Sequence, residues 1–88
     1  MSENQKLQEA VEKSKKLPTR PSNEELLQLY ALYKQATEGN ASGERPGGFD
    51  FKAIAKFDAW NALQGMPEDQ AVKCYVDFVD VLQNKYGG

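Results

Sequence analysis

The chain has 88 residues, enough for one domain and too few for two. Apolar residues make up 40% of it and charged residues 27%, which is the composition of a folded globular protein rather than of a disordered one. The 11 basic and 13 acidic side chains give a net charge of -2, which excludes a general electrostatic affinity for nucleic acids or anionic membranes. We therefore expect a single domain over residues 1–88, in which any anion-binding site is local.

Two residue types that carry much protein chemistry are scarce. The chain has no histidine, so it lacks the commonest general base and the commonest metal ligand, and Cys74 is its only cysteine. A single thiol cannot form an internal disulfide or a cysteine-rich metal site. Without histidine, it also lacks the usual base that activates a cysteine nucleophile. We expect a protein that is not an enzyme and holds neither metal nor cofactor.

The location of the protein is also suggested by what the sequence lacks. No apolar run approaches the ~20 residues that span a bilayer, and the first residues carry no apolar stretch typical of a signal peptide. We expect a cytoplasmic monomer that does not insert stably into membranes and does not bind nucleic acid.

Helical periodicity predicts an all-α fold. Ser22 and Glu25 form a capping box ahead of one amphipathic stretch. Asp50 can cap another stretch, and Pro67 suits the first turn of the last one. No segment shows the polar and apolar alternation of a strand. The four predicted helices cover roughly residues 5–16, 23–38, 51–64 and 67–86.

The connection between the second and third helices is long and rich in helix breakers. Five glycine or proline residues fall within the ten positions 39–48. Connections of this length are uncommon in compact domains and are usually functional or needed as a crossover. Short links elsewhere favour antiparallel neighbours, so we expect a four-helix bundle with one crossover.

Tyr30, Tyr33 and Lys34 are the first candidates for a binding site. Their spacing places two phenols and one ammonium group on the same helical face. A tyrosine ring can stack on a base, its hydroxyl can donate to a phosphate, and a lysine supplies a point charge. The alternative, which spacing alone favours, is that both tyrosines fill the core while Lys34 faces solvent.

Lysines provide the second group of candidates. Lys52 and Lys56 lie one turn apart near the start of the third helix, where they can bind phosphates or form an ordinary solvated face. The basic cluster from Lys13 to Lys16 closes the first helix, where cations favour the negative end of the helix dipole. Together these side chains indicate an anion or nucleotide site, although each has a simpler structural explanation.

Longer stretches of the chain form a recognisable set of motifs. They are Leu29-Tyr30-Ala31-Leu32-Tyr33-Lys34-Gln35-Ala36-Thr37 followed by Gly39, Glu44-Arg45-Pro46-Gly47, Phe51-Lys52, Ala55-Lys56, Asp58-Ala59-Trp60-Asn61 with Gly65, Ala71 to Tyr75, and Lys85-Tyr86-Gly87. In order and spacing these motifs resemble the acyl-CoA-binding protein family, also called the diazepam-binding inhibitor family, from about Ala10 onward. This resemblance implies an up-down-down-up bundle of four helices. It also implies an intracellular carrier and pool former for long-chain fatty acyl-CoA esters, without chemistry.

The resemblance also implies roles for single residues. Tyr33 is expected to stack on the adenine, while Lys34 and Lys56 hold the 3′-phosphate of coenzyme A and Tyr30 helps at the phosphates. The implied partners are the acyl-CoA ester and enzymes that use it. Relatives are also processed into signalling peptides from a region like Gln35 to Lys52, so an interaction or signalling role is the alternative. The remaining implied contacts are Lys15, Lys52 and Tyr75 in the polar site and Val11, Leu26 and Leu27 along the acyl chain.

The sequence departs from the family pattern at three places. Ile54 stands where relatives commonly have lysine, and Phe57 stands where they have tryptophan. Met66 and Pro67 replace a hydroxyl residue that caps the last helix. The changes at Ile54 and Phe57 are expected to affect which acyl length the protein prefers.

Overall fold

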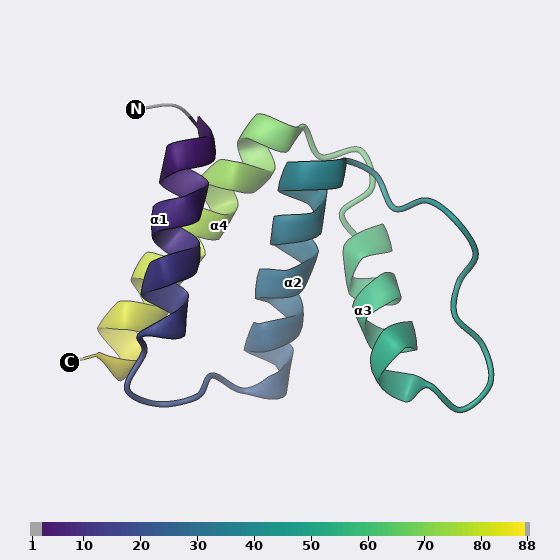
Figure 1. Ribbon diagram of the computed structural model, residues 1–88, viewed down its shortest axis with the longest axis horizontal. Coiled ribbons are helices and arrows are strands. Elements are labelled where there is room, and N and C mark those ends of the chain that lie inside the picture. The colour runs from purple at the N-terminus through teal and green to yellow at the C-terminus, as the bar shows by residue number, and fades with distance from the viewer. Residues whose placement is uncertain (1–2, 88) are drawn as a thin grey trace.

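The computed structural model describes residues 3–87, and in this part of the chain it contains four helices and no strand. The helices α1 and α4 run in one direction, and α2 and α3 run in the opposite one, with the long loop crossing from the end of α2 to the start of α3 (Figure 1). The predicted all-α, up-down-down-up arrangement is therefore confirmed. The bounds are α1 (Glu3–Lys15), α2 (Asn23–Glu38), α3 (Phe51–Asn61) and α4 (Glu68–Tyr86).

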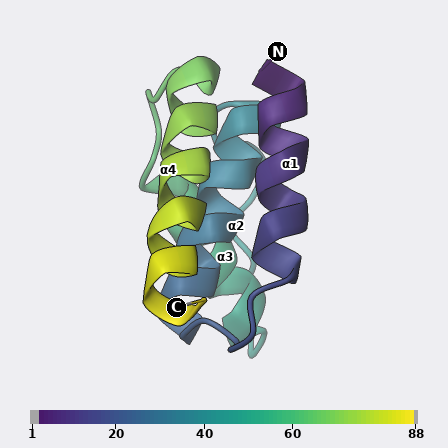
Figure 2. The same cartoon turned by 90° about the vertical axis from the view of Figure 1, so that its left-hand side faces the viewer.

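The molecule is flat: α1 and α4 are paired at one side, α2 lies beside them and α3 is outermost, so the helices do not close into a square bundle (Figures 1 and 2). α2 contacts α4 on one side and α3 on the other, and α4 also contacts α1 (Figures 1 and 2). Among the helices of residues 3–87, no other pair of helix backbones lies close together. The molecule accordingly measures 40 × 28 × 15 Å. Since α3 rests on α2 alone, the seam between these two helices is open along its flanks.

Local capping explains where α2 and α3 begin. The Ser22 hydroxyl accepts a hydrogen bond from the backbone N–H of Glu25 (3.2 Å), and the Glu25 carboxylate accepts one from the N–H of Ser22 (2.8 Å). The Asp50 carboxylate accepts from the N–H of Ala53 (3.1 Å). Each bond satisfies a donor that the first turn leaves free, so the two caps predicted from the sequence are confirmed.

The helix bounds differ from the predicted ones mainly at the end of α3. The prediction continued α3 to residue 64, but the helix ends at Asn61. Beyond it the chain tightens, because the N–H of Leu63 donates to the carbonyl of Trp60 (3.0 Å), three residues back. Gly65 then adopts φ +93°, a conformation that favours glycine. α1 covers residues 3–15 instead of 5–16, and α4 starts one residue later than predicted.

The main core lies where α1, α2 and α4 meet. Val79 and Leu82 of α4 are completely buried there. The apolar stripe of α4 thus forms the centre of the core. The other buried members are Leu7, Ala10, Leu29, Leu32, Ala36, Ala71, Val72 and Tyr75.

The long loop is tied to α3 by polar contacts at two points. The indole N–H of Trp60 donates to the carbonyl oxygen of Gly39 (2.7 Å). The guanidinium of Arg45 donates to both carboxylate oxygens of Asp58, each at 2.8 Å, in the two-pronged geometry that makes arginine pairs directional. These bonds link α3 to the end of α2 and to the loop, and so fix the position of α3.

Glu25 joins the start of α2 to the end of α4. Its carboxylate accepts hydrogen bonds from the Tyr86 hydroxyl and from the Lys85 ammonium group, the latter at 2.9 Å. These two bonds, the one from Tyr86 first, and the backbone bond from Ser22 lower the pKa of Glu25 from 4.5 to about 2. Because the pKa is lower in the folded chain, this stabilisation is complete above about pH 4.5 and disappears as the pH falls towards 2.

The Glu25→Gln variant is expected to be less stable than the wild type at neutral pH. It should also lose less of its free energy of unfolding when the pH is lowered from 4.5 to 2, because it lacks the carboxylate that titrates there. Urea unfolding followed by circular dichroism across this range measures both effects. Glu24→Gln, at the exposed neighbouring position, is the control. Equal acid losses in wild type and Glu25→Gln would contradict the assignment.

Candidate functional site

A groove of about 480 Å³ lies between the first halves of α2 and α3. This volume falls within the range of about 300–1,000 Å³ that is typical of small-molecule sites. Leu26, Leu27 and Tyr30 of α2 form one wall, and Phe51 and Ala55 of α3 form the other. The groove therefore offers a largely apolar surface to a ligand.

Positive side chains surround this apolar surface. Arg20 approaches from the loop before α2, and Lys52 and Lys56 come from α3. The lining contains no carboxylate, although acidic residues outnumber basic ones in the whole chain. A ligand that combines an apolar part with anionic groups matches this surface in both respects.

Two lysines lie over aromatic rings of the facing helix. The Lys56 Nζ of α3 is 5.3 Å from the ring centroid of Tyr30 in α2. The Lys34 Nζ of α2 is 4.9 Å from the ring centroid of Trp60 in α3. Such contacts hold an ammonium group in place while part of it still faces solvent. The seam between α2 and α3 therefore carries a positioned cation from each helix.

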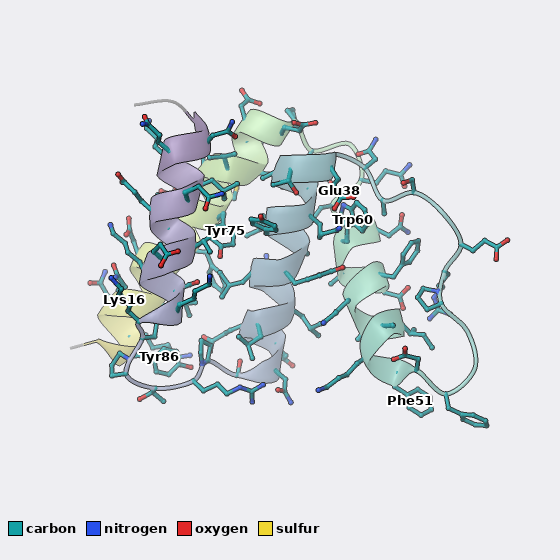
Figure 3. The ribbon with its side chains drawn as sticks, viewed as in Figure 1. Lys16, Glu38, Phe51, Trp60, Tyr75 and Tyr86 are labelled. Atoms are coloured by element: carbon teal, nitrogen blue, oxygen red, sulfur yellow. The ribbon has the colours of Figure 1, made fainter. Side chains whose placement is uncertain are left out.

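Lys34 already has an anionic partner. It is hydrogen-bonded to Glu38 one turn further along α2, and 24% of the Lys34 side chain is exposed. Figure 3 shows Glu38 and Trp60 together where the last turns of α2 and α3 meet. The bond to Glu38 raises the pKa of Lys34, with partial burial acting in the opposite direction. Lys34 is thus charged, and an incoming phosphate competes with Glu38 for it.

The Glu38→Gln variant is expected to bind an anionic ligand of the α2–α3 seam a few-fold more tightly, because it releases Lys34 from its pair. An exposed ion pair of this kind contributes about 0.2–1 kcal/mol, which limits the gain to roughly five-fold. Calorimetric titration with the acyl-CoA ester that the sequence resemblance implies measures the effect. The matched control is Glu44→Gln, which removes an exposed carboxylate of the long loop. Unchanged or weaker binding by Glu38→Gln would show that Lys34 does not contact the ligand.

Tyr33 is outside the groove lining and packs towards the main core, where it meets Tyr75 of α4. Their ring centroids are 6.3 Å apart, and Tyr75 is only 4% exposed. Burial raises the pKa of the Tyr75 phenol, so its hydroxyl is neutral and can donate a hydrogen bond. Tyr33 is half-buried and packs against the core. Of the two tyrosines for which the spacing left a core role open, Tyr33 packs against the core, whereas Tyr30 lines the groove.

Two further predicted contacts belong to α1. The Lys15 side chain is 68% exposed and lies 4.0 Å from a Glu12 carboxylate oxygen. Val11 is half-buried against the main core. α1 contacts α4 and does not touch α3, so neither residue reaches the groove wall.

The structure thus brings together one half of the predicted site. The predicted residues that line the groove are Leu26, Leu27, Tyr30, Lys52 and Lys56. The predicted residues outside its lining are Val11, Lys15, Tyr33, Lys34 and Tyr75. The lining residues that are absent from the predicted site are Arg20, Asn23, Phe51 and Ala55. Helical spacing is a signal for Asn23, Phe51 and Ala55. Asn23 lies four residues before Leu27, and Phe51 lies four residues before Ala55, so each pair shares one helical face.

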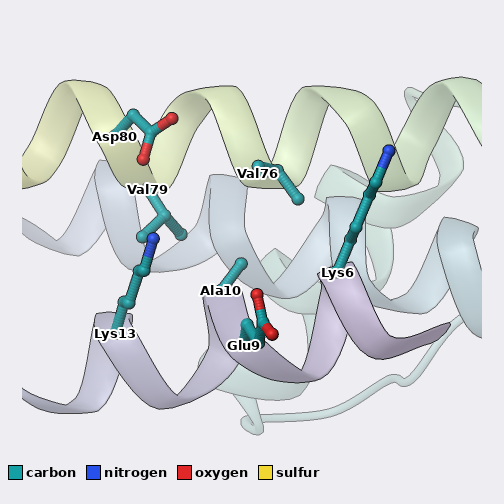
Figure 4. A pocket seen from close by; sticks show the side chains of 7 residues that line it. All are labelled: Lys6, Glu9, Ala10, Lys13, Val76, Val79 and Asp80. Carbon is teal, nitrogen blue, oxygen red and sulfur yellow. The ribbon is translucent and has the colours of Figure 1, made fainter. Parts of the chain in front are cut away.

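A second, smaller hollow lies between α1 and α4. Its volume is about 90 Å³, far below that of a typical ligand site. Lys6, Lys13, Glu9 and Asp80 surround it, so opposite charges stand side by side above an apolar floor (Figure 4). Neither its size nor its charge pattern suits the anionic ligand that matches the groove.

Within residues 3–87, no group of three or more cysteine, aspartate or glutamate side chains is arranged to hold a metal ion. No helix in this part of the chain is long and apolar enough to cross a bilayer.

Comparison with known proteins identifies the family. A family model described as acyl CoA binding protein matches residues 4–79. The chain belongs to the acyl-CoA-binding protein family. It is 51% identical to acyl-CoA-binding protein homolog 1 of Caenorhabditis elegans over 73 residues, which cover 83% of this chain and 85% of the relative. It is 46% identical to the acyl-CoA-binding protein of Saccharomyces cerevisiae over 82 residues, which cover 93% and 94% of the two chains.

Solved acyl-CoA-binding protein structures share the fold. The crystal structure of Oryza sativa acyl-CoA-binding protein 2 superposes with a TM-score of 0.89 at 40% identity, covering 96% of this chain and 93% of the rice chain. The similarity extends over nearly the whole chain, so the groove lies within the part that the family shares.

Proposed function

We propose that the chain binds long-chain fatty acyl-CoA esters and carries them without changing them chemically. The observation that carries this proposal is the groove between α2 and α3, which joins an apolar wall at Leu26 and Leu27 to a lysine held over Tyr30. An acyl-CoA ester has the matching parts, an apolar chain and a phosphate-bearing nucleotide. Relatives with about half of their residues identical are named acyl-CoA-binding proteins, which supports the same ligand here.

We assign the parts of the ligand to side chains by their chemistry. The acyl chain contacts Leu26 and Leu27, and the phosphates contact Lys52, Lys56 and the hydroxyl of Tyr30. A phosphate monoester carries roughly two negative charges, which lysine ammonium groups meet as compact point charges.

The polar contacts outside the groove complete the proposed site. Lys34 joins Lys56 at the 3′-phosphate after it leaves Glu38, and Tyr33 stacks on the adenine beside Tyr75. Val11 and Lys15 of α1 form the edge of the site nearest the core.

The chain is proposed to act as a monomeric cytoplasmic carrier that hands the ester to enzymes of fatty acid metabolism. Hydrolysis of a thioester needs an activated nucleophile, and the chain has no histidine to activate its single cysteine. The 1–88 segment is proposed to work as one acyl-CoA-binding domain.

Affinity is expected to rise with acyl length and then level off. Each methylene group buried in the groove contributes about 0.8 kcal/mol, or about four-fold in affinity, until the chain outgrows the groove. Calorimetry with saturated acyl-CoA esters of increasing length tests this. Leu27→Ala should weaken the binding of long esters and spare short ones, whereas Val81→Ala, at an exposed position of α4, should change neither. Affinities that do not depend on acyl length would contradict the assignment of the groove.

A further inference from the structure

Two phenylalanine rings are exposed at the start of α3, at the edge of the groove. Phe49 is 92% exposed and Phe51 is 70% exposed. Their ring centroids are 6.4 Å apart, in an edge-to-face arrangement. Figure 3 shows Phe51 beside the first turn of α3, at the edge of the molecule. Large apolar side chains that are held together in water usually mark a contact surface.

The surroundings of this pair identify the kind of surface that it fits. Phe51 also lines the groove, together with Arg20, Lys52 and Lys56, and none of the residues in that lining is acidic. Asp50 separates the two rings in sequence, but its carboxylate accepts a hydrogen bond from the N–H of Ala53 in the first turn of α3. The pair is therefore flanked by cations on the groove side.

We propose that Phe49 and Phe51, together with Arg20 and Lys52, form a site that docks peripherally on an anionic lipid bilayer. Aromatic rings partition into the boundary between headgroups and acyl chains, while lysine and arginine pair with anionic headgroups. The net charge of -2 gives the protein as a whole no attraction to an anionic bilayer, so docking depends on this local site.

The docking site adjoins the groove, so it can act in the exchange of ligand with a membrane. This role in exchange rests on the proposed function. Because Phe51 belongs both to the exposed pair and to the groove wall, an acyl chain that leaves a bilayer beside it reaches the groove with little exposure to water. Docking should therefore speed the exchange of acyl-CoA between membrane and protein, while affinity in free solution stays the same.

The test uses purified protein and vesicles of phosphatidylcholine and phosphatidylserine in equal parts, without any acyl-CoA. Wild-type protein should float with these vesicles, and it should bind less well to pure phosphatidylcholine and at high salt. Phe49→Ser should lower vesicle affinity about ten-fold, because it removes a ring that becomes buried in the lipid. Val81→Ser is the matched control, since it removes another exposed apolar side chain, 55% exposed, from α4.

Two further measurements separate docking from folding and from ligand binding. Phe49→Trp should retain vesicle affinity, and its added fluorescence should shift to shorter wavelength with anionic vesicles, because the wild-type Trp60 is buried. Phe49 does not line the groove, so Phe49→Ser should bind palmitoyl-CoA in free solution with unchanged affinity.

The outcomes distinguish the docking site from the proposed function. The docking site is refuted if wild-type protein does not float, if Phe49→Ser and Val81→Ser float equally well, or if lipid charge makes no difference. A flotation pattern as expected, combined with no binding of palmitoyl-CoA in solution, would instead uphold the docking site and refute the proposed function.

Discussion

Replacing Lys56 by alanine is expected to lower the affinity for a long-chain acyl-CoA ester by roughly ten- to one-hundredfold. A hydrogen bond to a charged group contributes about 1.5–3 kcal/mol, and Lys56 is held beside Tyr30 at a groove whose lining contains no carboxylate. Its ammonium group is thus positioned before the phosphate arrives, so little side-chain freedom is lost on binding.

The ligand can be varied to test which phosphate Lys56 contacts. Titration with palmitoyl-CoA should show the full loss for Lys56→Ala, whereas the ester without its 3′-phosphate should bind wild type and variant with similar affinity. Lys73→Ala, at an exposed position of α4, is the control and should bind both esters like the wild type. Equal losses with both esters would place Lys56 elsewhere on the ligand, and no loss would remove it from the site.

Replacing Leu82 by alanine is expected to have the largest effect on stability. Its side chain is completely buried at the centre of the core, and cutting a buried leucine back to alanine costs about 2–5 kcal/mol. A chain of 88 residues has a total stability of about 4–13 kcal/mol, so this single change removes a large part of it.

Urea unfolding measures this loss directly. Val81→Ala is the control, because its side chain is 55% exposed beside Leu82, and a change there should stay within about 0.5 kcal/mol. The folded fraction of Leu82→Ala should bind palmitoyl-CoA normally, because α4 contributes nothing to the groove lining. Unfolding midpoints that are equal for Leu82→Ala and Val81→Ala would contradict the description of the core.

Features that depend on neighbours in sequence could be predicted from the sequence alone. The capping box of Ser22 and Glu25 and the cap at Asp50 each involve residues three apart, so their spacing was sufficient. The apolar stripe of α4 follows the helical period and is indeed buried. The bundle topology required more, and it was predicted through the resemblance to the family.

Features that depend on contacts across the fold were not predictable from the sequence. Arg20 reaches the groove only because the loop before α2 places it there. The bond between Trp60 and Gly39 joins residues 21 positions apart, and no local pattern reports it. The early end of α3 was missed because a three-residue hydrogen bond tightens the chain after Asn61.

The candidate site was likewise predictable where it depends on the spacing within one helix, and not where it depends on packing between helices. Lys52 and Lys56 share one helical face, and the structure places both at the groove. Tyr30 and Tyr33 were grouped by their spacing, but they face different neighbours across α2, Lys56 and Tyr75. Which side of α2 meets which helix is decided by packing, and the periodicity of a single helix does not contain that information.

Calorimetric titration of the wild-type protein with palmitoyl-CoA, coenzyme A and palmitate tests the central claim most directly. The groove joins an apolar wall to positioned cations, so the ester should bind at one molecule per chain and more tightly than either of its halves. The bound ester should also raise the melting temperature. Absence of saturable heat with palmitoyl-CoA, or palmitate binding as tightly as the ester, would contradict the account.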